Sequence, residues 1–590
     1  MSQDSLPNAA PWDREFLPPV PAWSGASEAL MVADDHPWVT HFELSRGMAS
    51  PSYEETRAWF ERAAAASDLV RIEVIGISPE GREIFAVIVS RDGATLDPQK
   101  PVLLVQSGIH PGEIDGNDAS QMLLRDIVFG DRGELIDQVN LVLVPILSVD
   151  GHARASAHSR PNQRGPEVQG WRHTARNLNL NRDFMKLDSP ELRAVFSLIQ
   201  RYPPSLYLDV HVTDGVDYQY DITYGFEGEQ GRFARSPAIG RWLDQVWRPR
   251  ADAALAQAGH IPGPLVFAVD DREPRRGLSV GMLGERFSNG WGDAAHIPTV
   301  LVENHSLKPF RQRVLGTYVL IEQSLVILAE DAGGVRAAIA SDRALRPERV
   351  PGNWRPDETP TGEMQGFLGI RFEMYDSAVS GGQEVRWLGE PDPEPWTMPL
   401  YGSSPGRHFE RASAYLVPAT HPEIIERLRA HGIEMQVLDA PATVEAERIR
   451  LGPVQISSRV SEGRIPMSVE EVTTFTAPHA LPAGSVRVPT DQPLGDIVVL
   501  LLEPQSSESF FAWGMFAEVL QRVEYIEGYA IAPLAEAMLE ADPQLRADFE
   551  ARLADDEAFR NNPDARLQWF YERTPFYDDR FRLYPVSRVP

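Results

Sequence analysis

The chain contains no cysteine. This absence rules out disulfides, thiolate metal sites and cysteine nucleophiles together. It does not fix the compartment, because a cysteine-free protein is equally suited to reducing and oxidising surroundings.

Long apolar runs are also absent. No run approaches the roughly 18 residues that a membrane span requires, and the longest ones, Leu141 to Leu147 and Ile497 to Leu502, are predicted to be buried strands. The first seven residues lack the basic and apolar regions of a secretory signal. We therefore expect no membrane span, and a cytoplasmic chain, or a periplasmic or secreted one if a signal has been removed.

Positive charge is scarce, with 56 Lys and Arg against 85 Asp and Glu and a net charge of -29. A surface of this sign repels phosphate backbones and anionic lipids, so a nucleic-acid partner is excluded. The 43% hydrophobic and 24% charged content is that of a soluble globular protein. None of these features indicates an oligomeric state.

With 590 residues, the chain is too long for a single hydrophobic core. We predict three parts: an N-terminal arm over 1–50, an α/β domain over 51–345, and a C-terminal α+β domain with a β-rich half over 346–590. The arm is rich in Pro and Trp and should pack along a domain surface by its aromatics. Pro347, Pro351, Pro356 and Pro360 mark a linker. Helices are expected at 512–523, 533–539 and 543–553.

The α/β domain is predicted from alternating strand and helix signals, which favour a mixed, mostly parallel central sheet with helices on both faces. Ligands of such sheets lie beyond the carboxyl ends of the strands. One apolar run, from Val102, ends at glycine and then presents His110 and Glu113. A catalytic zinc takes three nitrogen or oxygen ligands and keeps a fourth position for water, and these two residues could supply two of the three.

Two further strands end in groups of the same chemistry. The strand Leu206 to Val210 places His211 at its end, where it could be the third zinc ligand. If His211 is considered alone, the simpler interpretation is a histidine that forms a hydrogen bond at a strand end. The strand from Thr299 ends at Glu303. A carboxylate at the mouth of a sheet has its pKa raised by partial desolvation and can act as a general base; a salt bridge to Lys308 or Arg311 is the alternative.

The loop 170–184 carries three arginines and three asparagines. A loop of this composition could simply be solvated. Arginine also binds carboxylates with two parallel hydrogen bonds, so the loop equally suits the acidic end of a substrate.

Taken together and in this order, these four stretches resemble the zinc carboxypeptidase family of metallopeptidases, which includes the pancreatic carboxypeptidases and their bacterial relatives. The resemblance covers roughly residues 50 to 330 and implies the zinc carboxypeptidase fold. It implies that His110, Glu113 and His211 hold one Zn²⁺ ion.

The resemblance also implies the remaining roles. Glu303 would activate the zinc-bound water, Arg172 would stabilise the oxyanion, and Asn181 with Arg182 would bind the carboxylate of a peptide or amide substrate. The segment from Arg286 to Trp291, where the family sets specificity, has no acidic residue to attract a basic side chain, and we hypothesise that Arg286 favours acidic or cell-wall-derived substrates.

Three departures from the family pattern stand out. Asn179 occupies the place of an aspartate that orients a zinc histidine, and no tyrosine occurs between Tyr224 and Tyr318 to cover the substrate carboxylate. The segment from Arg286 to Trp291 does not align without a gap. We expect a zinc-dependent metallopeptidase that hydrolyses an amide near a free C-terminal carboxylate. The alternatives are a zinc amidohydrolase acting on cell-wall peptides or acylated amino acids, and a non-catalytic binding protein with a relic site.

Overall fold

The computed structural model describes residues 16–93, 95–281 and 283–589, so the first fifteen residues of the predicted arm lie outside the described residues. The remainder of the arm contacts the α/β part through its tryptophans. Trp38 stacks on Phe129 with ring centroids 3.8 Å apart, and Trp23 donates a hydrogen bond from Nε1 to the carbonyl oxygen of Gly259 at 2.9 Å. Among the described residues, no helix is both long and apolar enough to cross a membrane.

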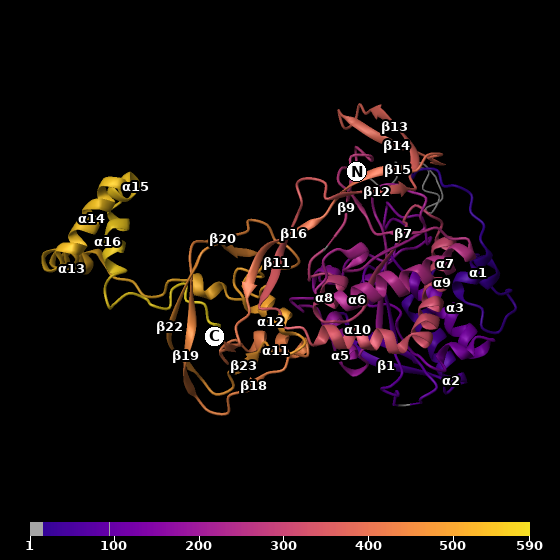
Figure 1. The fold of residues 1–590 in the computed structure, drawn as a ribbon, viewed down its shortest axis with the longest axis horizontal. Helices are drawn as coiled ribbons and strands as arrows, with labels where there is room; N and C mark the ends of the chain where they lie inside the picture. The colour runs from indigo at the N-terminus through magenta and orange to yellow at the C-terminus, as the bar shows by residue number, and fades with distance from the viewer. Residues whose placement is uncertain (1–15, 94, 282, 590) are drawn as a thin grey trace.

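The α/β part is built on an eight-stranded sheet of order β1-β2-β4-β3-β5-β10-β6-β7 (Figure 1). Its centre is parallel, since β3 pairs in parallel with β4 and β5, and β5 with β10. The β1-β2, β2-β4 and β10-β6 pairs are antiparallel. The strands are β1 (Val70–Ile77), β2 (Glu83–Val89), β3 (Val102–Ser107), β4 (Asn140–Val144), β5 (Leu206–Val212), β6 (Ile222–Gly225), β7 (Pro262–Pro264) and β10 (Thr299–Asn304). The predicted mixed sheet is confirmed.

Every residue of β3, β4 and β5 is buried. Because successive side chains of a strand point to opposite faces, both faces of the sheet must be covered. α3 and α9 pack against each other, α7 packs on α9, and α5 packs on β1. The main helices of this part are α2 (Tyr53–Ala66), α3 (Asp115–Phe129), α5 (Pro190–Arg201), α7 (Arg248–Ala258), α8 (Ser288–Ala294), α9 (Phe310–Glu330) and α10 (Ala332–Arg343).

Local signals explain where these helices begin. Ser52 and Glu55 form a reciprocal capping box at the start of α2. α5 has Ser189 as its N-cap, with a side chain that accepts from the Leu192 amide, and Pro190 at its first position. Both helices therefore start where the sequence supplies side-chain acceptors for their free amides.

The C-terminal region is rich in strands. A six-stranded sheet has the order β18-β23-β17-β24-β19-β22, and a four-stranded sheet, β12-β15-β9-β8, takes its last two strands from the α/β part. The strands include β8 (Phe267–Ala268), β9 (Leu278–Ser279), β11 (Arg349–Pro356), β12 (Gly362–Phe367), β13 (Ile370–Asp376), β14 (Gln383–Pro391), β15 (Trp396–Tyr401), β16 (Ser403–Glu410), β17 (Ala414–Val417), β18 (Gln436–Val437), β19 (Ala442–Leu451), β20 (Val454–Ile456), β21 (Met467–Val469), β22 (Val472–Leu481), β23 (Val486–Pro489) and β24 (Ser587–Val589).

The predicted boundary at residue 345 falls between α10 and β11. One hydrophobic core nevertheless runs across it, since Phe196 of α5 and Leu428 of α11 (Pro422–Ala430) belong to the same cluster of buried side chains. The helices α13 (Gly528–Ala541), α14 (Pro543–Asp555), α15 (Glu557–Arg560) and α16 (Pro563–Tyr571) enclose a small core of their own. They lie at the end of the molecule farthest from the large sheet (Figure 1).

Three local predictions for this region are wrong. The apolar run at 497–502 is the helix α12 (Gly495–Leu502), because a fully buried segment carries no periodicity that separates strand from helix. The proline-marked linker is largely the strand β11, which among the described strands pairs only with β16 and so tolerates prolines. The helix expected over 512–523 is a series of turns with one short 3₁₀ helix, Ala517–Leu520.

Candidate metal centre

The turn after β3 places His110 and Glu113 at the carboxyl edge of the sheet. Gly108 starts this turn with φ +67, and an added Cβ would lie 3.2 Å from the backbone of Ile146. The turn then closes with a hydrogen bond from the Glu113 amide to the carbonyl oxygen of His110 at 2.8 Å. His211 comes from the neighbouring strand β5, whose parallel pairing with β3 brings both strand ends to the same edge.

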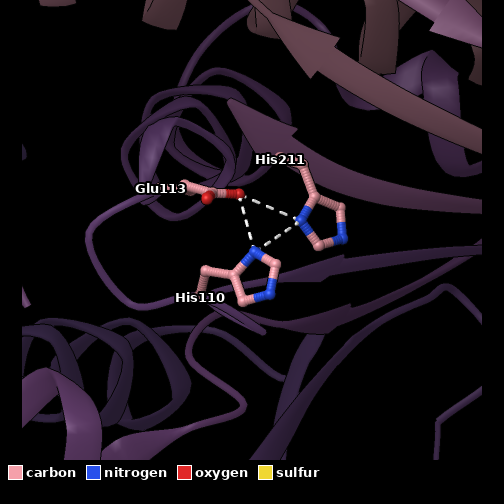
Figure 2. A group of neighbouring side chains, drawn as sticks. All are labelled: His110, Glu113 and His211. Carbon is pink, nitrogen blue, oxygen red and sulfur yellow. Dashed lines mark hydrogen bonds and ion pairs between the residues drawn. The ribbon is translucent and has the colours of Figure 1, made fainter. Parts of the chain in front are cut away.

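The three side chains converge on one point (Figure 2). Glu113 Oε2 lies 3.1 Å from His110 Nδ1 and 3.0 Å from His211 Nδ1, and the two nitrogens are 3.3 Å apart. All three residues are buried. Ligand atoms about 2.1 Å from a tetrahedral zinc ion stand roughly 3.4 Å apart, so this donor set fits zinc in both chemistry and spacing.

The outward nitrogen of each ring meets an oxygen acceptor. His110 Nε2 lies 2.8 Å from Asn179 Oδ1, and His211 Nε2 lies 2.9 Å from Asp209 Oδ2. An acceptor at Nε2 fixes the proton there and turns the lone pair of Nδ1 toward the centre. Burial lowers the pKa of His110 to about 4, which keeps its ring neutral and able to bind a metal.

The sequence indicated Asn179 but not Asp209. Asp209 stands two residues before His211 on the same strand, so both side chains project from the same face. This spacing is the signal that could have identified it. The two histidines therefore differ in their support, one bonded to a neutral amide and the other to a carboxylate.

The second oxygen of Glu113 is held by two arginines. Arg172 Nη1 lies 3.0 Å from Glu113 Oε1, and Arg160 Nη2 lies 2.7 Å from the same oxygen. These contacts leave Oε2 directed at the two histidines. Arg172 was among the predicted site residues, whereas Arg160 was missed, because one arginine in a long polar loop carries no recognisable pattern.

Glu303 faces the same cavity from β10. In the parallel pairing of β10 with β5 it lies opposite His211. Burial and the nearby Glu113 raise the pKa of Glu303, while His211 and Arg172 act in the opposite direction. A carboxylate with a raised pKa beside two imidazoles is suited to accepting and returning a proton near neutral pH.

Asn181 and Arg182 also line this cavity, whose volume is about 160 Å³. Asn181 accepts from the Ser288 amide at 3.0 Å, and the guanidinium of Arg182 lies 4.0 Å from the ring centroid of Phe287. Burial lowers the pKa of Arg182. Arg182 forms no ion pair with any described residue, so its charge is available to an incoming anion.

The structure does not bring Arg286 into this cavity. Its Nη2 pairs with Glu508 Oε1 at 2.7 Å, and its guanidinium lies 5.0 Å from the ring of Trp513. Glu508 and Trp513 both belong to the C-terminal region, and a local sequence pattern around Arg286 cannot predict a contact with residues so far along the chain. The substrate-binding role expected for Arg286 stays a prediction, for a side chain that is already paired in this structure.

A second cavity of about 420 Å³ adjoins the first and shares Leu265, Phe267 and Leu283 with it as a common wall. Glu227 lines it and accepts a hydrogen bond from Asn289 Nδ2 at 2.9 Å. Burial and the neighbouring carboxylates raise the pKa of Glu227 well above its ordinary value. Trp354 of β11 completes the lining, so residues from both sides of position 345 form this cavity.

Comparison with known proteins agrees with this geometry. Residues 56–252 match the family model described as zinc carboxypeptidase. The chain is 22% identical to carboxypeptidase 2 of Trichophyton tonsurans over 489 residues, which cover 80% of this chain and 85% of that protein. It is 26% identical to carboxypeptidase D of Mus musculus over 186 residues, 29% of this chain and 13% of that one.

Solved structures similar to this chain include two carboxypeptidases. The metallo-carboxypeptidase from Burkholderia cenocepacia has 16% identity and a TM-score of 0.36, with coverage of 48% of this chain and 71% of that one. Carboxypeptidase A from Helicoverpa armigera has 19% identity and a TM-score of 0.36, with coverage of 49% and 74%.

Proposed function

We propose that the protein is a zinc-dependent metallopeptidase that hydrolyses a peptide bond near a free C-terminal carboxylate, in line with the match of residues 56–252 to the zinc carboxypeptidase family model. One observation carries the proposal. Three donor atoms from two neighbouring strand ends converge within 3.3 Å of one another, and a half-buried carboxylate, Glu303, faces the same cavity.

Zinc bound by His110, Glu113 and His211 would supply a Lewis acid that lowers the pKa of its water to about 7. Glu303 takes a proton from the attacking water and passes it to the leaving amine. Its position suits this double role, because Glu303 lies opposite His211 in the pairing of β10 with β5 and lines the same cavity as the donor set.

The arginines act on the negative charge of the substrate. Arg172 lies at the mouth of the cavity with one third of its side chain exposed, and it donates to the carbonyl oxygen as charge develops there. Such a donor lowers the barrier by about 3 kcal/mol. Arg182 and Asn181 bind the terminal carboxylate, since Arg182 is a half-buried cation without an ion-pair partner among the described residues.

The side chain of the terminal residue would occupy the second cavity, beyond Phe267. Glu227 is the buried carboxyl group of that cavity, and Trp354 and Phe233 provide aromatic surface. A cationic or aromatic side chain would be stabilised there by ring contact, and a cationic one would also favour the ionised form of Glu227. An acidic side chain would gain no ion pair from Glu227 and would be disfavoured, because the nearby Arg232 and Arg248 are already paired with Glu229.

Replacement of Glu303 with Gln tests the proposal. The amide keeps the shape of the side chain but cannot take up the proton, so we expect peptidase turnover to fall at least about 10³-fold while metal analysis of the purified protein still finds one zinc per chain. Glu410→Gln, at an exposed position on β16, is the matched control and should keep full turnover.

Replacement of His110 with Ala should remove the zinc itself. Undiminished turnover of the Glu303→Gln variant would disprove the assignment of the base. Wild-type protein that binds no zinc would disprove the proposed function.

A further inference from the structure

One loop of the C-terminal region reaches the metal centre. Residues 457–466 connect β20 and β21, which pair in an antiparallel hairpin, and we call them the 457–466 loop. Hydrogen bonds close the loop at its base, from the Ser457 amide to the Pro466 carbonyl oxygen at 2.8 Å, and near its tip, between Ser461 and Arg464 at 2.8 and 2.9 Å. The tip is therefore a fixed structure.

An ion pair fastens this loop to the α/β part. Arg464 bonds Asp188 with two nitrogens, Nε to Oδ2 at 2.9 Å and Nη2 to Oδ1 at 2.6 Å. Asp188 also accepts from Arg427 Nη2 at 2.7 Å. Two-nitrogen arginine pairs fix orientation as well as distance, so the loop tip is held against the segment that contains Asn179 and Arg182.

At the tip, Glu462 contacts the support of a metal ligand. Glu462 Oε2 accepts a hydrogen bond from the Asn179 backbone amide at 2.9 Å. The side chain of Asn179 accepts in turn from His110 Nε2 at 2.8 Å and from the Asn181 amide at 3.0 Å. A continuous series of hydrogen bonds thus joins the C-terminal region to His110.

The backbone at Glu462 indicates that its side chain has a role. Glu462 has φ +49, a left-handed conformation that disfavours residues with a Cβ and that glycine or asparagine normally occupies. The next residue, Gly463, packs so closely that an added Cβ would lie 2.8 Å from Leu178. Strain of this kind persists where the side chain or its position is needed.

We propose that Glu462 is a positioning residue of the metal centre: by holding the backbone of Asn179, it keeps the Asn179 amide oxygen on His110 Nε2 and so orients the ring for zinc. The inference rests on the proposed function, because it assumes that His110 binds zinc. It makes the 457–466 loop part of the metal site and assigns the C-terminal region a direct role there.

The test is the dissociation constant of zinc, measured by competition with a fluorescent chelator on apoprotein of the full chain. Glu462→Gly removes the carboxylate while relieving the left-handed backbone, so the loop itself is not destabilised. We expect its Kd for zinc to rise about fivefold to tenfold, as loss of one hydrogen bond predicts. Glu462→Gln retains an oxygen acceptor and should change Kd less than about twofold.

A double-mutant cycle decides whether Glu462 acts through Asn179. Asn179→Ala alone should raise Kd at least about tenfold. If Glu462 acts only by holding Asn179, adding Glu462→Gly to that variant should raise Kd no further. The matched control is Glu470→Gly, an exposed acidic residue outside the loop, which should leave Kd unchanged. Far-UV circular dichroism of each apoprotein reports any loss of fold.

The outcomes are distinguishable. Unchanged zinc affinity in Glu462→Gly, with normal binding by the wild-type protein, would overturn the role of Glu462 and leave the proposed function standing. An equal loss in Glu462→Gln and Glu462→Gly would assign the effect to the charge of Glu462. A further loss in the Asn179→Ala background would show that Glu462 does not act through Asn179. Either result would overturn the proposed role. Absence of zinc binding by the wild-type protein would overturn both inferences.

Discussion

A buried histidine at the contact between the two large parts of the chain makes stability sensitive to acid. His431 follows α11, is buried, and its Nε2 lies 2.9 Å from the carbonyl oxygen of Met185. Its ring packs edge-on against Phe196 of α5, with centroids 5.2 Å apart. Burial lowers the pKa of His431 from 6.5 to about 4, against the raising effects of the Met185 carbonyl and Asp183.

The direction in which stability changes with pH depends on whether the folded or the unfolded chain binds the proton at the higher pH. Above pH 6.5 the ring is neutral in both states. As the pH falls from 6.5 to about 4, His431 becomes protonated in the unfolded chain but stays neutral in the folded chain, so the free energy of unfolding decreases. At 1.36 kcal/mol per pKa unit, the loss at pH 4.5 relative to pH 7.5 is about 2.5 kcal/mol.

Replacement of His431 with Gln removes the titration and can keep the donor to Met185. We expect the variant to be about 1 kcal/mol less stable at pH 7.5, because ring contact with Phe196 is lost, yet its stability should fall about 2.5 kcal/mol less between pH 7.5 and 4.5 than that of the wild type. Urea unfolding, followed by tryptophan fluorescence at both pH values, measures the difference.

The comparison between variant and wild type isolates His431 from the other buried histidines, which contribute equally to both proteins. His158→Gln, at an exposed position, is the matched control and should keep the wild-type pH dependence. If His431→Gln loses as much stability on acidification as the wild type, the burial argument for this residue is wrong.

Three further predictions concern the site. Asp209→Asn should weaken zinc binding about tenfold and Asn179→Asp should tighten it by a similar factor, because a carboxylate is the stronger acceptor for a ligand histidine; chelator competition measures both, and equal affinities would contradict the argument. Arg182→Lys should raise KM for peptides about tenfold with zinc content unchanged, since one ammonium cannot replace two parallel hydrogen bonds; an unchanged KM would remove Arg182 from carboxylate binding. Matched peptides ending in Lys, Phe and Glu should be cleaved in that order, and Glu227→Gln should reduce the advantage of Lys over Phe; equal rates for all three would exclude Glu227 as a determinant of specificity.

Much of the site could be predicted from sequence because its parts are local. A buried strand that ends in glycine and is followed by His110 and Glu113 specifies its own turn, and the strand ending at His211 is read in the same way. The order of these stretches, with Glu303 at the end of a third strand, was enough to indicate the fold and the metal chemistry. Burial of both faces of the central strands was visible as continuous apolar runs.

Tertiary structure alone decided the groups that surround the site. Arg160 forms an ion pair with Glu113, 47 residues earlier in the sequence, and Arg286 pairs with Glu508, 222 residues later. Glu462 meets Asn179 across 283 residues. The segment 497–502, predicted as a strand, is a helix. It is buried on every side, so its sequence has no pattern of polar and apolar residues that would distinguish a helix from a strand. Sequence thus determined what each strand end carries, through periodicity and turn chemistry that act over a few residues. Which charges pair across the folded surface depends on chain packing, and no local pattern encodes that.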